Sequence, residues 1–480
     1  MKLSTKVAYN TIIQFASKII STGLGLIAIA LTARYLGQIG FGEYTTAFTF
    51  ISFFAIAADL GLTLITVQLI SPKEANQDKI LGNLLALRLV SAIIFLGLAP
   101  MSVLFFPYSA DIKIAVAILA FSFLFTSLNQ ILVGLFQKHL RMDKVSIAEV
   151  ASRIVLIAAT FWAIKADKGL GGIMIATVLS SAASFIMHYI FSFNFTKIKL
   201  RFDFSYWKKI ISRSWPLAIT IVFNLIYLKT DTLLLSIIKR PSKIGIMAEV
   251  GIYGAAYKVI DVLITFPFMF AGIILPILTA RWTEGREADF KKVLQKSFDV
   301  MAMLAIPLII GTQFVAKDIM TLVAGEKFGA SGPVLKILIG AAALIFLGVM
   351  FSHAIIAINK QRQIIWAYIF TAISSVIGYI IIIPYFSYFG AAWVTIYSES
   401  FIAIVGIYLI YKYTKFLPNI KILLKSLAAS SVMALTIFIL NSNSNPNLFF
   451  TLSAAVIIYF ISLYLFRGLN KKDILSLLNK

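Results

Sequence analysis

The chain has 480 residues, no cysteine, 60% hydrophobic residues and 13% charged residues. Soluble domains average roughly 45–50% apolar and about 25% charged residues, so this composition excludes a soluble globular protein and indicates a chain that lies in a membrane along most of its length. The lack of cysteine excludes disulfide frameworks, thiolate catalysis and cysteine metal sites. The three histidines, His139, His188 and His353, are too scattered to predict a metal site.

The net charge of +23 comes from basic residues that stand mainly in short loops between apolar segments. Such placement orients a membrane protein, whereas a nucleic-acid groove needs cations that follow a phosphate backbone. We therefore expect no nucleic-acid partner. The first apolar stretch, 7–33, is too long for the core of a signal peptide and no small-residue cleavage site follows it, so we expect it to remain as the first helix.

Apolar runs long enough to cross a bilayer recur along the whole sequence. A crossing needs roughly 20 apolar residues. Fourteen such runs predict an all-α polytopic membrane protein with about 14 transmembrane helices. In chain order the predicted spans are 7–33, 41–69, 80–106, 112–137, 145–164, 171–193, 209–238, 249–280, 294–316, 332–358, 363–383, 390–411, 421–440 and 447–466.

The loops predict the orientation. With the N-terminus placed inside, 28 of the 43 lysines and arginines fall in inside segments and 10 in outside segments. This asymmetry predicts that both termini are cytoplasmic, and hence an even number of helices in the plasma membrane. All loops are short, no G-x-x-x-x-G-K-[ST] loop is present, and no D-x-D pair occurs that could hold a metal-bound sugar nucleotide.

A short pattern occurs twice. FGEYTTAF (41–48) and VGIYGAAY (250–257) each have glycine, tyrosine two residues later, then alanine and an aromatic residue. Each opens a helix that returns from outside to inside, which predicts two six-helix lobes as a parallel pseudo-repeat. The predicted division is 1–200 for helices 1–6, 201–415 for helices 7–12, and 416–480 for two C-terminal helices and a cytoplasmic tail.

The run ARYLGQIGFGEYTTAFTFISFFAIAADLGL (33–62) resembles the start of Wzx-type oligosaccharide flippases, the polysaccharide-export branch of the multidrug/oligosaccharidyl-lipid/polysaccharide superfamily. The matching features are Arg34, Leu36-Gly37, Gly40-Phe41-Gly42, Tyr44 and Asp59-Leu60-Gly61. In the middle of the chain, KTDTLLL followed by VGIYGAAYKV resembles the start of the family's second lobe. Length, helix number and the layout of twelve helices plus two agree with this family.

The resemblance implies a transporter, not an enzyme, that moves an undecaprenyl-diphosphate-linked oligosaccharide from the inner to the outer leaflet for lipopolysaccharide or capsule biosynthesis. It implies two lobes that alternate access to a central cationic cavity. Its expected partners are the lipid-linked oligosaccharide, membrane lipids, and the polymerase and glycosyltransferases of the same pathway. It implies no cofactor beyond coupling to H⁺ or Na⁺.

Ionisable residues inside the predicted spans are candidates for this cavity. A charge at mid-bilayer costs roughly 2.5–3.5 kcal/mol, so each such residue should face the bundle interior, water or a partner. The predicted substrate-binding cations are Lys18, Arg34, Arg88, Arg153, Lys229 and Lys258. The predicted ion-coupling or gating carboxylates are Asp59, Asp231, Asp261 and Glu399.

Helical spacing leaves two interpretations open for some of these residues. Glu149 with Arg153, and Lys258 with Asp261, share helix faces and can neutralise each other as structural pairs. Lys229 and Asp231 are about 200° apart around a helix, so at least one needs a partner elsewhere.

Depth along the helices adds to the case for a cavity. Lys18, Arg88 and Arg153 lie roughly 12–18 Å from the cytoplasmic ends of their helices, and Lys229 and Lys258 lie in the outer half. Together they would offer positive charge at several depths to a diphosphate group.

Three alternatives stay open. A lipid II flippase and a cation-coupled drug exporter belong to the same superfamily. A multispan glycosyltransferase or polymerase would use the same lipid donor, but the external loop carboxylates Asp111, Asp167, Asp318 and Glu326 are solitary in the sequence.

Overall fold

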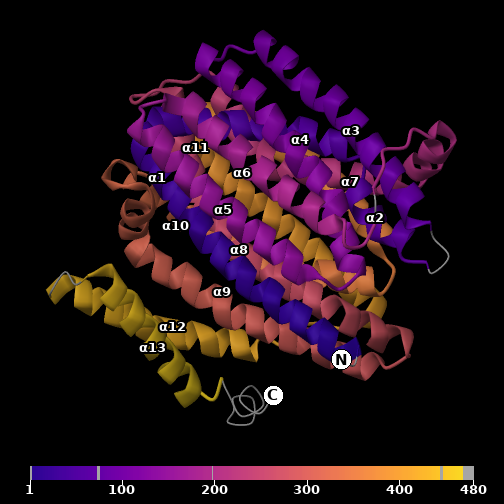
Figure 1. Ribbon diagram of the computed structural model, residues 1–480. Helices are drawn as coiled ribbons and strands as arrows, with labels where there is room; N and C mark the ends of the chain where they lie inside the picture. The colour runs from indigo at the N-terminus through magenta and orange to yellow at the C-terminus, as the bar shows by residue number, and fades with distance from the viewer. Residues whose placement is uncertain (1–2, 73–75, 197, 444–446, 469–480) are drawn as a thin grey trace. The chain divides into compact units, whose positions relative to one another are not determined.

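The computed structural model describes residues 3–72, 76–196, 198–443 and 447–468, and the regular elements in these ranges are helices (Figure 1). Two single 3-10 turns, η1 (Val103–Phe105) and η2 (Glu326–Phe328), interrupt the series. The helices are α1 (Leu3–Asp59), α2 (Leu62–Ile70), α3 (Gln77–Ser102), α4 (Ala110–Lys138), α5 (Met142–Lys165), α6 (Gly169–Ser192), α7 (Phe204–Ile237), α8 (Ile246–Thr283), α9 (Glu287–Ala324), α10 (Ser331–Ala357), α11 (Gln361–Thr414), α12 (Lys421–Asn443) and α13 (Leu448–Leu465).

Two of these helices are long enough to cross a bilayer twice. α1 has 57 residues and α11 has 54, and each contains one residue with non-helical backbone angles, Gly37 (φ 65°) and Ser387 (φ 50°). These kinks lie between predicted spans 7–33 and 41–69 and between 363–383 and 390–411. The second predicted span is itself broken by positive φ values at Leu60 and Gly61, so that its last turns form α2.

The prediction of a polytopic membrane protein is confirmed. Within the described ranges, eleven helices are long and apolar enough to cross a membrane, with α1 and α11 each counted once. Because α1 and α11 each cover two predicted spans and α7 covers 209–238, every predicted span coincides with helix. The chain is therefore an all-helical, multi-pass membrane protein, with about fourteen crossings.

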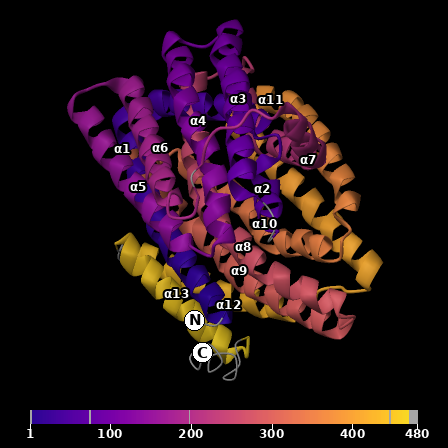
Figure 2. The same cartoon turned by 45° about the vertical axis from the view of Figure 1, so that its right-hand side comes forward.

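The chain divides into two compact units, Met1–Gly251 and Ile252–Lys480. In the first unit α6 packs against α4 and α5, while α1 contacts α3, α4, α5 and α7. In the second unit α10 packs between α9 and α11, and α12 and α13 lie side by side on α9 (Figure 2). Each unit has its own buried apolar core, for example around Phe136 in the first and Phe351 in the second.

The repeated pattern forms a close helix contact inside the first unit. A β-carbon at Gly42 would collide with the carbonyl oxygen of Met247, and one at Gly251 would collide with that of Gln38. The two pattern glycines therefore occupy equivalent places in one crossing of α1 with the start of α8, where only glycine permits the backbones to approach. The predicted boundary at 200/201 follows the repeat and stays a prediction. The division by contacts falls at Gly251, because α7 packs on α1, α2 and α3.

The predicted orientation can be tested with single cysteines, since the natural chain has none. Ser205 precedes a predicted inside-to-outside span and Ser442 follows another, and both residues are exposed. We expect a membrane-impermeant thiol reagent to label Ser442→Cys on intact cells and Ser205→Cys only after permeabilisation. Labelling of Ser205→Cys on intact cells would contradict the orientation.

Candidate functional site

A buried ionic network stands where α1 ends. The Arg88 guanidinium of α3 forms an ion pair with the Asp59 carboxylate and also donates to the Asp59 carbonyl (2.8 Å). Its remaining nitrogens donate to the Ser127 carbonyl (3.2 Å) and to the Gln130 side-chain oxygen on α4. The Thr63 hydroxyl lies 2.5 Å from Asp59 Oδ1 and 2.8 Å from Gln130 Oε1. Arg88 is only 1% exposed and Asp59 8%, whereas Thr63 is half-buried and Gln130 is exposed, so the ion pair is buried at one end of a network that opens to the surface at Gln130.

The network follows from the broken helix. The last carbonyls of a helix lack partners within it, and here the positive φ values at Leu60 and Gly61 end α1 inside the apolar span. Arg88 satisfies the carbonyl of Asp59, and the Ser91 hydroxyl donates to that of Ala58 (2.8 Å). Gly61 is required because a β-carbon there would come within 2.7 Å of the Ser214 carbonyl on α7. The ion pair thus caps a helix end that lipid could not solvate.

This geometry bears on two predicted site residues. The sequence placed Arg88 among the cavity cations and Asp59 among the coupling carboxylates, with no link between them. The structure joins them and buries Arg88, whereas the side chains of the other predicted cations are exposed or half-buried. Thr63 and Gln130 were missed, because uncharged polar residues within a span give no signal in one sequence.

The other predicted cations of the first unit are accessible. Arg153 is exposed near the middle of α5, and its guanidinium faces Gly25 of α1, where a β-carbon would lie 3.9 Å away. Lys18, on the same α1, is half-buried. The described contacts contain no ion pair between Glu149 and Arg153, so the structural pair that the spacing allowed does not form. Arg34 is exposed near the kink of α1.

Four of the predicted site residues lie on α7 and α8, two on each helix. On α7, Asp231 is 1% exposed and its carboxylate accepts the Thr232 amide, while Lys229 is half-buried. On α8, the expected pair forms, because Lys258 Nζ lies 3.8 Å from Asp261 Oδ2 with both side chains partly exposed.

A second buried ion pair follows α7. Arg240 Nη2 lies 2.6 Å from Glu249 Oε2, and Arg240 Nη1 donates to the carbonyls of Leu235 (2.7 Å) and Ile238 (2.9 Å). The arginine caps the end of α7 and ties it to the first turn of α8. Arg240 follows predicted span 209–238 and is one of the 10 basic residues in the predicted outside segments. The sequence did not predict its capping role, because that role depends on the ends of two helices lying together.

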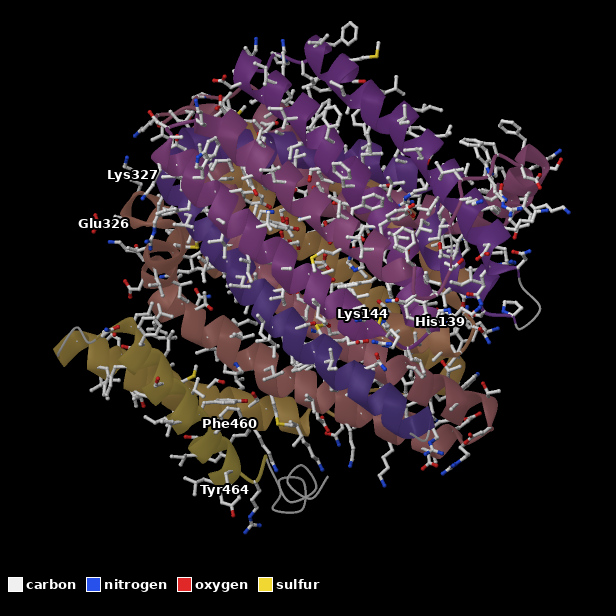
Figure 3. The ribbon with its side chains drawn as sticks, viewed as in Figure 1. His139, Lys144, Glu326, Lys327, Phe460 and Tyr464 are labelled. Atoms are coloured by element: carbon white, nitrogen blue, oxygen red, sulfur yellow. The ribbon has the colours of Figure 1, made fainter. Side chains whose placement is uncertain are left out.

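Glu399 is buried on α11 in the second unit, within electrostatic range of Tyr368. His188 and His353 each donate from Nδ1 to the carbonyl four residues earlier, at 2.8 and 2.9 Å, whereas the buried Nε2 of His188 has no hydrogen-bond partner among the described residues. His139 lies near Lys144 at the turn between α4 and α5 (Figure 3). No metal-ligand cluster of acidic residues and histidines occurs within the described ranges.

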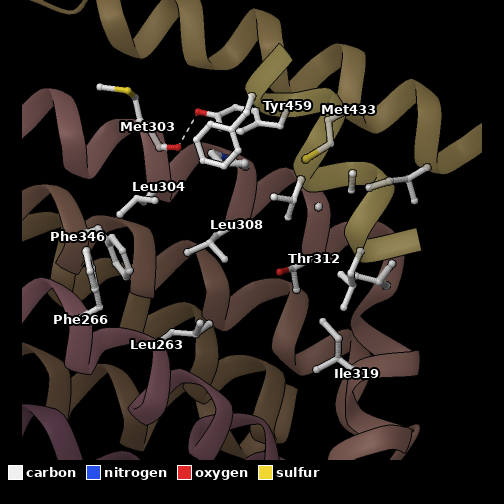
Figure 4. A pocket seen from close by; sticks show the side chains of 18 of the residues that line it. Leu263, Phe266, Met303, Leu304, Leu308, Thr312, Ile319, Phe346, Met433 and Tyr459 are labelled. Carbon is white, nitrogen blue, oxygen red and sulfur yellow. Dashed lines mark hydrogen bonds between the residues drawn. The ribbon is translucent and has the colours of Figure 1, made fainter. Parts of the chain in front are cut away.

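An apolar pocket of about 510 Å³ lies in the second unit between α8, α9 and α10 on one side and α12 and α13 on the other (Figure 4). Leu308 and Thr312 of α9 line it, as do Phe346 of α10 and Met433 of α12. At its edge Tyr459 donates to the Met303 carbonyl (2.6 Å), so that its polar atom is satisfied (Figure 4). The pocket is therefore suited to a hydrocarbon chain.

The fold resembles those of known membrane transporters. The inward closed conformation of the lipid II flippase MurJ superposes with a TM-score of 0.74 at 18% identity, covering 98% of this chain and 100% of that one. An inward-facing multidrug resistance MATE family transporter of the MOP superfamily superposes with a TM-score of 0.68 at 14% identity, covering 84% and 98%. At these identities the likeness defines the fold alone.

The family follows from the sequence matches. The model of the family described as polysaccharide biosynthesis protein matches residues 7–282, more than half of the chain, which therefore belongs to that family. The probable low-salt glycan biosynthesis flippase of Haloferax volcanii is 22% identical over 395 residues, 82% of this chain and 80% of the relative. The capsular polysaccharide biosynthesis protein CapF of Staphylococcus aureus is 22% identical over 292 residues, 60% of this chain and 72% of the relative.

The buried network predicts an asymmetric response to mutation. Arg88→Ala removes the cation that neutralises the Asp59 carboxylate and the donor to a helix-end carbonyl, and breaking a buried ion pair in this way costs about 3–5 kcal/mol. We expect a large fall in the unfolding midpoint of the purified protein, with partial recovery in the double variant Arg88→Ala/Asp59→Asn.

Arg141→Ala is the matched control, because it breaks a 2.9 Å pair with Asp143 in which the arginine is 45% exposed. Exposed pairs contribute about 0–1 kcal/mol. Equal losses in Arg88→Ala and Arg141→Ala would show that the Arg88 network does not support the fold.

Proposed function

We propose that this protein is a flippase that moves a polyprenyl-diphosphate-linked oligosaccharide from the inner to the outer leaflet of the cytoplasmic membrane, for the biosynthesis of a cell-surface polysaccharide. Membership of the polysaccharide biosynthesis family and a flippase-like fold supply the class. The Haloferax relative, named as a probable glycan biosynthesis flippase, supports the substrate class.

One observation carries the proposal. Arg153 stands near the middle of an apolar helix, is exposed, and has no ion-pair partner among the described contacts. A lone arginine facing hydrocarbon at this depth is strongly disfavoured, so its side chain faces an aqueous space. With Lys18 half-buried on the neighbouring α1, the space carries positive charge where a substrate diphosphate has to cross.

The apolar pocket is consistent with the lipid part of the proposed substrate. A lipid-linked sugar has a long hydrocarbon chain that stays in the bilayer while its head group crosses. The pocket beside α12 and α13 offers about 510 Å³ lined by apolar side chains such as Leu308 and Phe346. We propose that it holds part of the polyprenyl chain during transport.

The energy source is proposed from charge placement. The chain has no P-loop sequence, and buried or half-buried carboxylates occur within helices at Asp231, Asp261 and Glu399. These carboxylates are proposed to bind H⁺ or Na⁺. Lys229 in the first unit and Lys258 in the second are proposed as further cations that contact the substrate. In this scheme the protein is a transporter without catalytic residues, and both termini are cytoplasmic.

The test is transport by the purified protein in vesicles that contain a fluorescent polyprenyl-diphosphate oligosaccharide and no nucleotide. We expect flipping without ATP. Arg153→Gln should slow it roughly tenfold to hundredfold, the loss expected when a hydrogen bond to a charged group is removed. Vesicles without protein set the background rate.

Lys165→Gln is the matched control, because Lys165 is an exposed cation at the far end of the same helix and lies over the Phe161 ring. It should transport at the rate of the unsubstituted protein. A strict requirement for ATP would refute gradient-driven or downhill transport. Flipping of lipid II in place of the oligosaccharide lipid would assign the alternative substrate.

A further inference from the structure

The segment that joins α6 to α7 alternates exposed basic and exposed apolar residues. Lys199 and Arg201 are exposed, and Leu200, Phe202 and Phe204 are 50%, 54% and 71% exposed. The pattern continues on the first turns of α7, where Phe204, Lys208, Ile211 and Trp215 are exposed and share one helix face, with Lys209 beside them. We call residues 199–215 the basic-aromatic strap.

The strap is fixed to the protein. The Arg201 amide donates to the Gly82 carbonyl of α3 (3.2 Å), and Asn83 Oδ1 accepts from the Asp203 amide (3.0 Å) and from the Trp207 indole (3.2 Å). Gly82 permits this contact, because a β-carbon there would collide with the Lys199 carbonyl. The strap therefore presents its exposed side chains from a backbone that α3 holds in place.

The one carboxylate of the strap is already engaged. Asp203 accepts the Tyr206 amide (3.0 Å) at the start of α7 and lies 3.4 Å from Lys79 Nζ. The hydrogen bond from Tyr206, with help from Lys79, holds the pKa of Asp203 below its usual range. In contrast, the described contacts give Lys199, Arg201, Lys208 and Lys209 no carboxylate partner. Among the side chains that the structure describes, the strap is left with four exposed positive charges; its fifth basic residue, Arg213, lies outside that set.

The predicted spans place the strap at the membrane boundary. It runs directly into the predicted span 209–238, and Phe202 and Phe204 pack on the Trp207 ring at centroid distances of 5.8 and 5.0 Å. Aromatic residues concentrate at the level of the lipid head groups, where basic segments attract anionic lipids. A strap that faced water alone would leave three large apolar side chains, Leu200, Phe202 and Phe204, at least half exposed.

We propose that the basic-aromatic strap binds anionic phospholipid head groups at the membrane interface, with Leu200, Phe202 and Phe204 inserted at the boundary between head groups and acyl chains. The four cations supply charge complementarity and the apolar side chains supply depth. Because the strap joins the start of α7 to α3, bound anionic lipid would hold these two helix ends together. This binding does not depend on which substrate the protein transports.

The experiment uses Ser205→Cys, an exposed position within the strap, labelled with a fluorophore in the full-length protein. The protein is reconstituted in phosphatidylcholine vesicles that carry a nitroxide quencher on the upper acyl chain of either phosphatidylglycerol or phosphatidylcholine, at equal mole fraction. We expect stronger quenching by phosphatidylglycerol, with about fivefold local enrichment for each contributing cation. At 1 M salt, where screening acts within about 3 Å, this excess should disappear.

Two sets of variants decide the outcome. Lys199→Gln/Arg201→Gln/Lys208→Gln/Lys209→Gln should make the two lipids quench equally. The control carries the same charge change at exposed lysines of the second unit, Lys292→Gln/Lys296→Gln/Lys360→Gln/Lys421→Gln, and should keep the excess. Phe202→Ser/Phe204→Ser should weaken quenching by both lipids, because the strap would withdraw from the acyl region.

Size-exclusion chromatography verifies that each variant is folded before its quenching is compared. Equal quenching by the two lipids in the unsubstituted chain would overturn the proposal. So would an excess that survives neutralisation of the four strap cations, or one that the second-unit control removes equally.

Discussion

The free-energy cost of placing charge in hydrocarbon is the constraint on which the rest of this structure depends. The chain meets it in three ways. Arg88 and Arg240 are paired with buried carboxylates and cap helix ends. Arg153 is exposed and Lys18 is half-buried, and both are proposed to contact water or an anionic ligand. The cations of the basic-aromatic strap are proposed to lie at the membrane interface. Sorting the charges by these three solutions separates residues that hold the fold from residues that can act on a substrate.

The backbone obeys the same constraint. Helices that cross a bilayer must satisfy their carbonyls internally, so a break inside a span needs a local donor. At Leu60 and Gly61 the donor is Arg88, which explains why an arginine and an aspartate distant in the sequence are buried together. Two helix backbones can approach closely only where the residues between them are small. Gly42 of α1 and Gly251 at the start of α8 meet this requirement. This contact explains the glycine that the two copies of the repeated pattern share.

Hydropathy and loop charge were sufficient to predict the helices, since every predicted span coincides with one. The gaps between predicted spans coincide with the kinks at Gly37 and Ser387. The break at Leu60 and Gly61 inside a predicted span was not predicted, because hydropathy does not register backbone angles. Spacing predicted the Lys258–Asp261 pair correctly and allowed a Glu149–Arg153 pair that does not form. The Arg88–Asp59 network could not be predicted from the sequence, because its members come from separate helices and two of them, Thr63 and Gln130, carry no charge. The apolar pocket could not be predicted either, because side chains that line an apolar pocket and side chains that face lipid have the same composition.

The central claim is that Arg153 faces an aqueous space that receives the anionic head group of the substrate. The absence of cysteine permits a direct measurement with Arg153→Cys and, one residue along the same helix, Ile154→Cys, where isoleucine is 57% exposed on an apolar surface. A water-soluble, membrane-impermeant thiol reagent should modify Arg153→Cys and spare Ile154→Cys, and a polyprenyl-diphosphate oligosaccharide should slow the reaction at position 153. Equal modification of both cysteines, or reaction at position 153 with lipid-soluble reagents alone, would contradict the account.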